Sequence, residues 1–596
     1  MFFKQQKQNF KNKLQTMKKN YLLLFFCFLA SFAMQAQSFT FNNINYTVTD
    51  VSNKYVKVSY LSTYTGAISI PTTVTYLSDP YTVTAIENDA FANLPITSVG
   101  IPDSVLSIQD NAFTGCTSLA MVTMSDNVTS IGTGVFFNCS NLGSITLPNS
   151  LVSIGFNAFS GCSNLVTAVV GTGLQSLGHS AFYNCEKLAS IAIPNGVTTI
   201  EYDTFTGCSA LATATIGNAV TAINYGAFFE CTSLASIVIP DTIQNVGYNA
   251  FSGCSNLTTV SMGTGLETLG HSAFNNCAKL SSINLSDNLI TIEDDTFAGC
   301  SALTTAILGS TLTSIGKGAF FECSSLQNIT IPDNVTTIGF EAFYECTALT
   351  SAIIGSSVTS IGDRAFIRCA ALGGIAIPNA VVTIGSEAFA DCSAMTTATF
   401  GTALTTIGTL AFYNCIALES LAFPNSLTTL GASSFFANVK VKTIALGSGI
   451  TTIGDNSFAF CQALTSVNID ASTPPVINAN VFDGLTLATI GLSGANIGAY
   501  RTAPVWANFK SATLGLSALD LVALQVYPNP TTDMINVQLP INVTLTSVSI
   551  YSSTGQLMRK SMSSQMNVAD LSAGNYIVSI ATDKGFVNKK IVKAVF

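Results

Sequence analysis

Cysteine is the chain's most reactive residue type, and its copies recur every 23 positions. The column begins at Cys116, Cys139 and Cys162 and ends at Cys461, with Asn438 as its single exception. These thiols could form disulfides, bind zinc, or lie buried and unreactive. If equivalent residues of successive repeats stack about 4.8 Å apart, their Cβ atoms stand farther apart than the roughly 3.5–4.5 Å of a disulfide. We therefore favour buried free thiols, while disulfides in a secreted protein stay an alternative.

Zinc fits the cysteine column poorly. A zinc site needs four ligands in a tetrahedral set, and the chain offers no Cys-x-x-Cys pair and no histidine near the column to complete one. We expect neither a metal ion nor any other cofactor.

The two histidines are the next candidates for chemistry. His179 and His271 lie 92 residues apart and are one position copied by duplication. A stacked His/Asp/Ser group is one interpretation, and a solvated turn residue is the one we favour. With so few histidines, most acid-base and nucleophilic schemes lack their usual base.

Acidic side chains gather near both histidines in the sequence. Glu293, Asp294 and Asp295 form one group, and residues 201–203 form its counterpart. Their carboxylates could bind Ca²⁺, but neither group matches a calcium loop, so we favour charged, solvated turns. A hydrolase would need a catalytic constellation in residues 38–90 or 470–520, and we find none there. The chain is predicted not to be an enzyme.

These residues are positioned by a strict repeat of 23 residues. Sixteen phenylalanines follow this period, from Phe113, Phe136 and Phe159 to Phe458. Such self-similarity predicts a solenoid in which each repeat packs on its neighbours. Within each repeat, apolar residues first alternate with Ser or Thr, as in a strand. The remainder is too short for a full helix, so turns or 3₁₀ segments are expected. The fold is therefore predicted to be mainly β, with 23-residue coils and a parallel sheet.

Composition shifts divide the chain into five parts. Lys18, Lys19 and the apolar stretch that follows resemble a signal peptide ending at Ala36, with Met17 as a possible true start. That stretch is too short to span a bilayer, so no transmembrane segment is expected in the mature chain. The predicted parts are a signal peptide (1–36), an N-terminal β cap (37–90), the repeats (91–469), a C-terminal cap and linker (470–515), and a small β-sandwich (521–596).

The repeat resembles a known family. It can be written Leu326-x-x-Ile329-x-Ile331-Pro332-x-x-Val335-x-x-Ile338-Gly339-x-x-Ala342-Phe343-x-x-Cys346, which is similar to the BspA-like class of leucine-rich repeats. The resemblance implies a secreted or surface-exposed bacterial protein, and some relatives are adhesins for host matrix proteins or neighbouring cells. Leucine-rich repeats commonly accept Asn or Cys at an inward column, which accounts for Asn438 and argues against disulfides.

The last segment has a resemblance of its own. Residues 524–596 look like the C-terminal sorting domain of the type IX secretion system of Bacteroidetes. The motif residues are Pro528, Asn529, Pro530, Gly555, Gly574 and Tyr576. The resemblance implies that the type IX machinery is a partner, and that the protein is secreted or anchored at the outer-membrane surface.

The strand positions expected to face outward are short of charge. Of 32 such positions between Met121 and Asn468, 19 are Ser or Thr and none is charged. This predicts either a neutral ligand-binding face or only a well-solvated sheet. The candidate ligand residues are Ser144, Thr146, Thr213, Thr215, Thr259, Ser261, Thr397 and Thr399.

The charge of the whole chain limits which classes of molecule it can bind. Only 9% of residues are charged and the net charge is -9, so no basic patch is available for phosphates and nucleic acid is excluded. The sequence predicts a recognition or adhesion protein that binds proteins or glycans. A structural surface-layer or biofilm matrix protein without a single ligand is the alternative.

Overall fold

The computed structural model describes most of the chain between the ends. The described residues are 11, 15, 16, 18, 37–494, 496–510, 524–539, 543–552, 556–582 and 585–594. Almost all of the predicted signal peptide (1–36), including Met17, lies outside them, as does Gly555. The chain forms two compact units, which are Met1–Val358 with Arg364–Leu372, and Thr359–Asp363 with Gly373–Phe596. Each unit is considered separately below.

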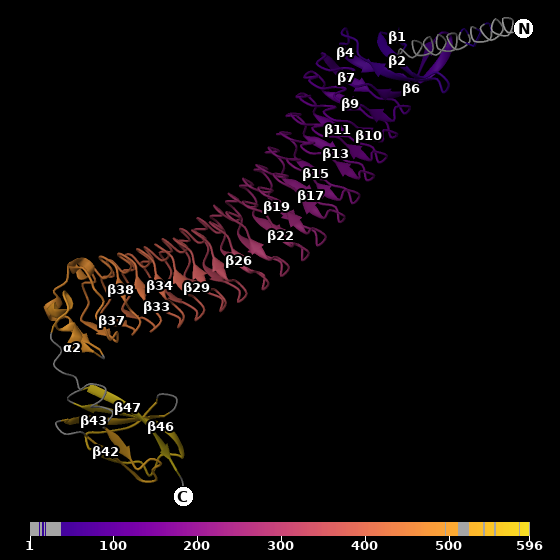
Figure 1. Ribbon diagram of the computed structural model, residues 1–596. Helices are drawn as coiled ribbons and strands as arrows, with labels where there is room; N and C mark the ends of the chain where they lie inside the picture. Colours follow the sequence, from indigo (N-terminus) through magenta and orange to yellow (C-terminus); the bar gives the residue numbers. More distant parts are fainter. Residues whose placement is uncertain are drawn as a thin grey trace, which may run out of the picture. The chain divides into compact units, whose positions relative to one another are not determined.

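The first unit contains a long parallel sheet with one strand from each coil (Figure 1). Partners lie one repeat apart, so Ser144 pairs with Thr167 and Ile145 with Ala168. Most of these three-residue strands are exposed at both ends and buried in the middle. The 13 strands are β4 (Gly66–Ser69), β7 (Ile96–Gly100), β9 (Met121–Thr123), β11 (Ser144–Thr146), β13 (Thr167–Val169), β15 (Ser190–Ala192), β17 (Thr213–Thr215), β19 (Ser236–Val238), β21 (Thr259–Ser261), β23 (Ser282–Asn284), β25 (Thr305–Ile307), β27 (Asn328–Thr330) and β29 (Ser351–Ile353).

Each coil adds a second, two-residue strand in which a Ser, Thr, Ala or Asn precedes a buried apolar residue. The first row pairs in the parallel order β8-β10-β12-β14 and the next in the order β16-β18-β20-β22. Turns connect the two strands of a coil. The strands are β8 (Ser107–Ile108), β10 (Ser130–Ile131), β12 (Ser153–Ile154), β14 (Ser176–Leu177), β16 (Thr199–Ile200), β18 (Ala222–Ile223), β20 (Asn245–Val246), β22 (Thr268–Leu269), β24 (Thr291–Ile292), β26 (Ser314–Ile315) and β28 (Thr337–Ile338).

The N-terminal segment covers the first coil and extends both sheets. It comprises β1 (Ser38–Phe41), β2 (Ile44–Asp50), β3 (Tyr55–Ser59), β4, β5 (Thr73–Tyr76) and β6 (Asp79–Ile86). β6 pairs in parallel with β8, and β4 pairs in parallel with β7. The Tyr64 ring lies 4.8 Å from that of Phe91. An array of coils would otherwise expose its apolar end at this point.

The second unit continues the same pattern of coils and then changes. Its array strands are β30 (Ser360–Ile361), β31 (Gly374–Ala376), β32 (Thr383–Ile384), β33 (Thr397–Thr399), β34 (Thr406–Ile407), β35 (Ser420–Ala422), β36 (Thr429–Leu430), β37 (Thr443–Leu446), β38 (Thr452–Ile453), β39 (Ser466–Ile469) and β40 (Gly491–Ser493). In the described part of the chain after β39 there are four short helices, namely η1 (Ala479–Phe482), η2 (Leu487–Thr489), α2 (Ile497–Tyr500) and η3 (Trp506–Asn508). Trp506 is buried, and its Nε1 donates to the Pro475 oxygen at 2.9 Å.

The last strands form the small sandwich expected from the sequence. Antiparallel strands β41 (Gln525–Tyr527), β42 (Met534–Gln538) and β45 (Gln565–Asn567) make one sheet, and β43 (Leu545–Ser552), β44 (Leu557–Ser561), β46 (Gly574–Thr582) and β47 (Gly585–Lys593) make the other. They enclose one apolar core that includes Ile535, Val548 and Val578.

The motif residues of this domain lie at its surface and in its strands. Pro528, Asn529 and Pro530 are exposed. The Asn529 side chain donates to the Lys590 oxygen at 2.9 Å and accepts from the Val592 N–H at 2.8 Å, so it binds the backbone of β47. Gly574 begins β46, and the Tyr576 hydroxyl donates to the Ser572 oxygen at 2.9 Å.

The phenylalanine column forms a continuous ring stack inside each unit. From Phe91 to Phe366, neighbouring ring centroids are 4.9–5.7 Å apart and their planes are within 19° of parallel. In the second unit, the stack runs from Phe389 to Phe482 with spacings of 5.0–5.9 Å. All of these rings are buried. Phe91 and Phe482 extend the stack although neither follows the 23-residue period.

Removing one ring should leave a cavity that rigid neighbours cannot fill. We expect Phe251→Ala to cost about 3–5 kcal/mol of stability, measured as a lower urea midpoint by circular dichroism. Tyr183→Ala, which removes a ring that is 36% exposed in a coil three repeats earlier, is the control and should cost about 1 kcal/mol or less. Equal losses of stability in the two variants would contradict the conclusion that the buried ring stack contributes more to stability than an exposed ring does.

Candidate ligand-binding surfaces

The cysteine column lies in the core as free thiols. Among the described residues, fifteen cysteines are buried thiols that form no disulfide. Their Sγ atoms contact the carbonyl oxygens of earlier ladder phenylalanines, as in Cys116 with Phe91 at 2.9 Å and Cys139 with Phe113 at 3.1 Å. Cys162 makes the same contact with Phe136 at 3.1 Å. Each of these three thiols therefore serves as a weak second donor to a carbonyl that already accepts a backbone N–H within its own turn.

Asn438 performs the same task with an amide. Its Nδ2 donates to the Phe412 oxygen at 2.9 Å, which is the equivalent carbonyl one repeat back. Its Oδ1, however, is buried without a hydrogen-bond partner. The column thus selects a small side chain with a donor, which both Cys and Asn supply.

We expect Asn438→Cys to stabilise the second unit. The thiol keeps a donor for the Phe412 carbonyl and removes the unpaired amide oxygen, so the gain should be about 1 kcal/mol. Asn438→Ala should instead cost about 1–3 kcal/mol because the carbonyl loses its donor. Urea midpoints of both variants test this pair, and a loss for the cysteine variant equal to that for the alanine variant would refute it.

The buried thiols also make stability depend on alkaline pH. Burial raises the pKa of the Cys162 and Cys254 thiols from 9.0 to about 12. The folded-state pKa is above the unfolded one, so this contribution is complete below about pH 9 and is lost as the pH rises toward 12. The urea midpoint should fall progressively over that window and recover on return to neutral pH. A flat profile would mean that the thiols are not buried.

The candidate ligand residues chosen from the sequence lie on the first strand of their coils. In the first unit, Ser144 and Thr146 are on β11, Thr213 and Thr215 on β17, and Thr259 and Ser261 on β21; in the second unit, Thr397 and Thr399 are on β33. All eight are exposed. A cavity of about 420 Å³ includes Thr215, Val238 and Asp241 in its lining.

This face is less uniform than its Ser and Thr content suggests. Four coils of the first unit place an apolar residue larger than alanine at the outer strand end, at Val169, Val238, Ile307 and Ile353, and these side chains are 50%, 64%, 56% and 60% exposed. The face therefore offers hydroxyl groups interrupted by apolar side chains at intervals of two or three coils, with no charge on its strands.

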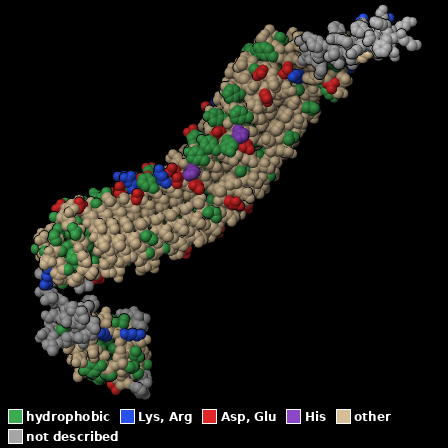
Figure 2. All heavy atoms as spheres, in the orientation of Figure 1, with side chains coloured by type: hydrophobic (Ala, Val, Ile, Leu, Met, Phe, Trp, Pro, Cys, Tyr) green, Lys and Arg blue, Asp and Glu red, His purple; other side chains and the backbone are tan. Residues whose placement is uncertain are grey.

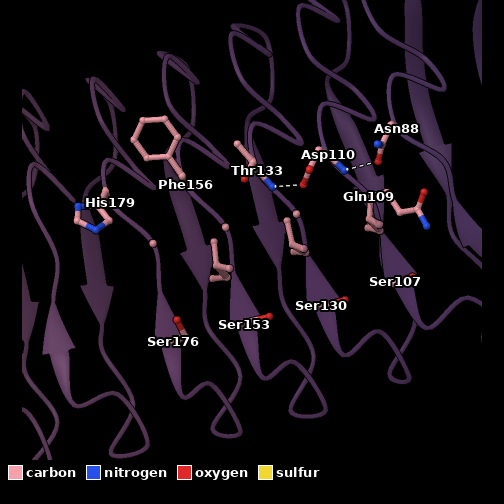
Figure 3. A pocket seen from close by; sticks show the side chains of 16 residues that line it. Asn88, Ser107, Gln109, Asp110, Ser130, Thr133, Ser153, Phe156, Ser176 and His179 are labelled. Atoms are coloured by element: carbon pink, nitrogen blue, oxygen red, sulfur yellow. Dashed lines mark hydrogen bonds between the residues drawn. The ribbon is translucent and has the colours of Figure 1, made fainter.

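A larger groove lies on the other row of strands, where sequence reasoning placed no site. It has a volume of about 540 Å³ and crosses β8, β10, β12 and β14 (Figure 3). Ser107, Ser130, Ser153 and Ser176 line it, one from each coil and paired in register. Asn88, Gln109, Asp110 and Thr133 line one part, and Phe156 and His179 line another.

Glycines form the floor beside these serines. Gly132, Gly155 and Gly178 occupy equivalent positions in three successive coils, between Gln109 and Glu201 in the same column. A Cβ on Gly155 would lie 2.4 Å from the Gly132 carbonyl carbon, so the backbones are too close for any larger residue. These glycines did not single out the groove in the sequence, because the same column also holds glycine in seven successive coils from Gly316 to Gly454.

A row of exposed rings begins at the groove. Phe156, His179, Tyr202, Tyr225, Tyr248 and His271 stand at equivalent positions of six successive coils. The rings of His179 and Tyr202 stack at 4.9 Å, and those of Tyr225 and Tyr248 at 5.4 Å. Figure 2 shows both histidines at the surface beside acidic side chains, with hydrophobic side chains near them.

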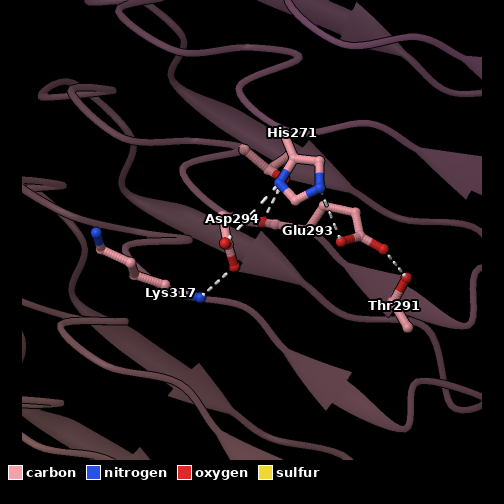
Figure 4. Close-up of polar contacts among 6 residues, drawn as sticks. His271, Thr291, Glu293, Asp294 and Lys317 are labelled. Atoms are coloured by element: carbon pink, nitrogen blue, oxygen red, sulfur yellow. Dashed lines mark hydrogen bonds and ion pairs between the residues drawn. The ribbon is translucent and has the colours of Figure 1, made fainter.

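Both imidazoles meet carboxylates in the next coil. His179 Nε2 lies 3.6 Å from Glu201 Oε2, and His271 Nε2 lies 3.5 Å from Glu293 Oε2 (Figure 4). His271 Nδ1 is 3.9 Å from Asp294 Oδ2. The Glu293 carboxylate also accepts a hydrogen bond from the Thr291 hydroxyl at 2.8 Å. The residues that the structure describes contain no group of three or more side chains suited to hold a metal ion.

A coil with two short parallel strands, repeated around a phenylalanine stack, defines a leucine-rich-repeat solenoid. The family model for the BspA type leucine rich repeat region matches residues 84–212, 203–324, 290–415 and 382–500. The chain therefore belongs to this family, as its repeat pattern predicts. Residues 525–594 match a secretion system C-terminal sorting domain, which makes this a secreted or cell-surface protein.

Solved structures of bacterial leucine-rich repeat proteins are similar to this chain. A leucine-rich repeat protein from Bacteroides ovatus is 28% identical, with 72% of this chain and 94% of that chain covered and a TM-score of 0.41. A leucine rich cell surface protein from Faecalibacterium prausnitzii is 25% identical, with coverages of 74% and 96% and a TM-score of 0.32. No curated protein matches the chain. Within the described ranges, no helix is long and apolar enough to span a membrane.

Proposed function

We propose that the protein is a recognition protein of the outer cell surface that binds protein or glycan ligands through the uncharged faces of its repeats. The observation that carries this proposal is the alternation in strands such as β11 and β17, whose outer residues are exposed while the middle one is buried. Pairing in register repeats that pattern from coil to coil. The array therefore presents a broad surface instead of a single reactive cleft.

The chemistry of the candidate residues also supports recognition over catalysis. Both histidines are roughly half exposed and contact carboxylates of the turns. The cysteines are buried, with pKa values raised by desolvation, as for Cys208, so they do not supply reactive thiolates near neutral pH. We propose on these grounds that the array is not catalytic.

The sorting domain supports the location of this activity. It implies handling by the type IX secretion machinery, which is then a partner of residues 525–594. A chain delivered in this way places its repeats outside the cell, where matrix proteins, polysaccharides and neighbouring cells are the available ligands.

The test is a binding screen of the purified full chain against matrix proteins, polysaccharides and whole cells, followed by titration of any hit. We expect saturable binding that changes little between low and high salt, because the strand face carries no charge to be screened. Thr213→Lys combined with Thr215→Lys should weaken binding at least about tenfold, since a buried unpaired ammonium costs more than ~1.4 kcal/mol.

Thr198→Lys is the matched control, because it adds a charge at an exposed position next to β16, outside the first row of strands. It should leave binding unchanged. Self-association of the chain without any saturable ligand would instead favour the structural matrix protein.

A further inference from the structure

The serines of the groove have hydroxyls that the protein itself does not use. Among the described residues, no hydrogen bond is formed by the side chains of Ser107, Ser130, Ser153 or Ser176. Hydroxyls in a neighbouring column behave differently, since Thr129 donates to the Leu106 oxygen at 3.0 Å. Four unpaired hydroxyls at the spacing of parallel strands, about 4.8 Å, are therefore available to a ligand.

The lining mixes polar and apolar groups and is almost without charge. Asn88 and Gln109 supply amides, and Asp110 is the one carboxylate among the lining residues. Asp110 Oδ1 already accepts the Thr133 N–H at 2.8 Å. No Lys or Arg lines the groove, so an anionic ligand would find no countercharge there.

The far end of the groove adds apolar surface. Phe156, which is 48% exposed, and His179 lie on the same side of the groove in Figure 3. An exposed ring of this kind packs well against flat C–H surfaces. The groove thus combines hydrogen-bonding groups along its length with rings at one end.

A second copy of this region of the chain lacks several of the features that line the groove. Four coils further on, Tyr248 and His271 replace Phe156 and His179, and Glu293 again closes the glycine column. The equivalents of Ser153 and Ser176 are Asn245 and Thr268, whose side chains bond to each other at 2.5 Å. Tyr202 and Tyr225 stand where the first copy has Asp110 and Thr133. Ala222 also stands where the first copy has Ser130, so of these two copies only the first has four unbonded hydroxyls in register.

We propose that the groove across β8, β10, β12 and β14 binds a neutral oligosaccharide. The serine hydroxyls, the amides and Asp110 bond to sugar hydroxyls, and Phe156 packs against the face of a sugar ring. This inference rests on the proposed recognition function and names one site and one ligand class for it. The volume lies within the ~300–1,000 Å³ of small-molecule sites, and one hydroxyl per coil matches a ligand made of repeating hydroxylated units.

An extended peptide fits the same groove less well. Peptides add to a sheet through a free strand edge, whereas β8, β10 and β12 are each paired on both sides. The groove also offers few apolar pockets for side chains, because its lining is mostly Ser, Gly, Asn, Gln and Thr. A polyhydroxylated chain uses the hydroxyls directly.

The experiment measures binding of the full chain to short gluco-, manno-, galacto- and xylo-oligosaccharides by calorimetry, with oligogalacturonate as the acidic comparison. We expect at least one neutral oligosaccharide to bind and oligogalacturonate not to bind. Phe156→Ala should lower that affinity at least about tenfold, and Thr133→Tyr, which introduces the residue type of the second copy, should abolish binding. Tyr248→Ala is the matched control and should leave the affinity unchanged.

The outcomes separate this inference from the proposed function. Failure of every neutral oligosaccharide to bind, or equal binding by wild type and Thr133→Tyr with unchanged urea midpoints, overturns the groove as a glycan site. Preference for the acidic oligosaccharide or for a peptide overturns it too. If matrix proteins still bind through the Thr213 and Thr215 face, the recognition function survives that failure; if no ligand binds any part of the array, both are wrong.

Discussion

Pairing of equivalent residues in successive coils is the constraint on which this structure depends. Because partners lie one repeat apart, every side chain meets a copy of its own position above and below. Phenylalanine satisfies this condition by stacking, as between Phe113 and Phe136 at 5.3 Å. The small donors Cys139 and Asn438 satisfy it by bonding to the backbone of the adjacent coil. The core is thus built of columns of equivalent residues, and the residue type in each column must be able to pack against further copies of that position.

The same constraint limits charge. Like charges stacked at strand spacing repel one another, and only 9% of residues are charged. Where charges do occur one repeat apart, they can alternate in sign, as in Glu341 with Arg364 at 3.5 Å and Glu419 with Lys442 at 3.6 Å. The neutral Ser and Thr surface therefore has a structural cause as well as a consequence for the ligands that it can bind.

A specific site arises in such an array where columns change. The groove lies where serine fills one column from Ser107 to Ser176 and where the ring row starts at Phe156. Duplication then supplied a second copy in which Asn245 and Thr268 bond to each other. When the two copies diverge in sequence, one set of coils can bind a ligand while the equivalent set keeps only a structural role.

The sequence by itself determined the coil length, the phenylalanine and cysteine columns, the family and the sorting domain, because a strict period reports which residues stack. It also predicted that Ser144 and Thr146 point outward, since period-two alternation defines the two faces of a strand. Only the tertiary structure decided that Phe91 and Phe482 join the ring stack, because their coils differ in length from 23 residues and leave the period. It alone revealed the groove, because a period along the chain does not tell which neighbouring columns converge in space or which hydroxyls remain unpaired.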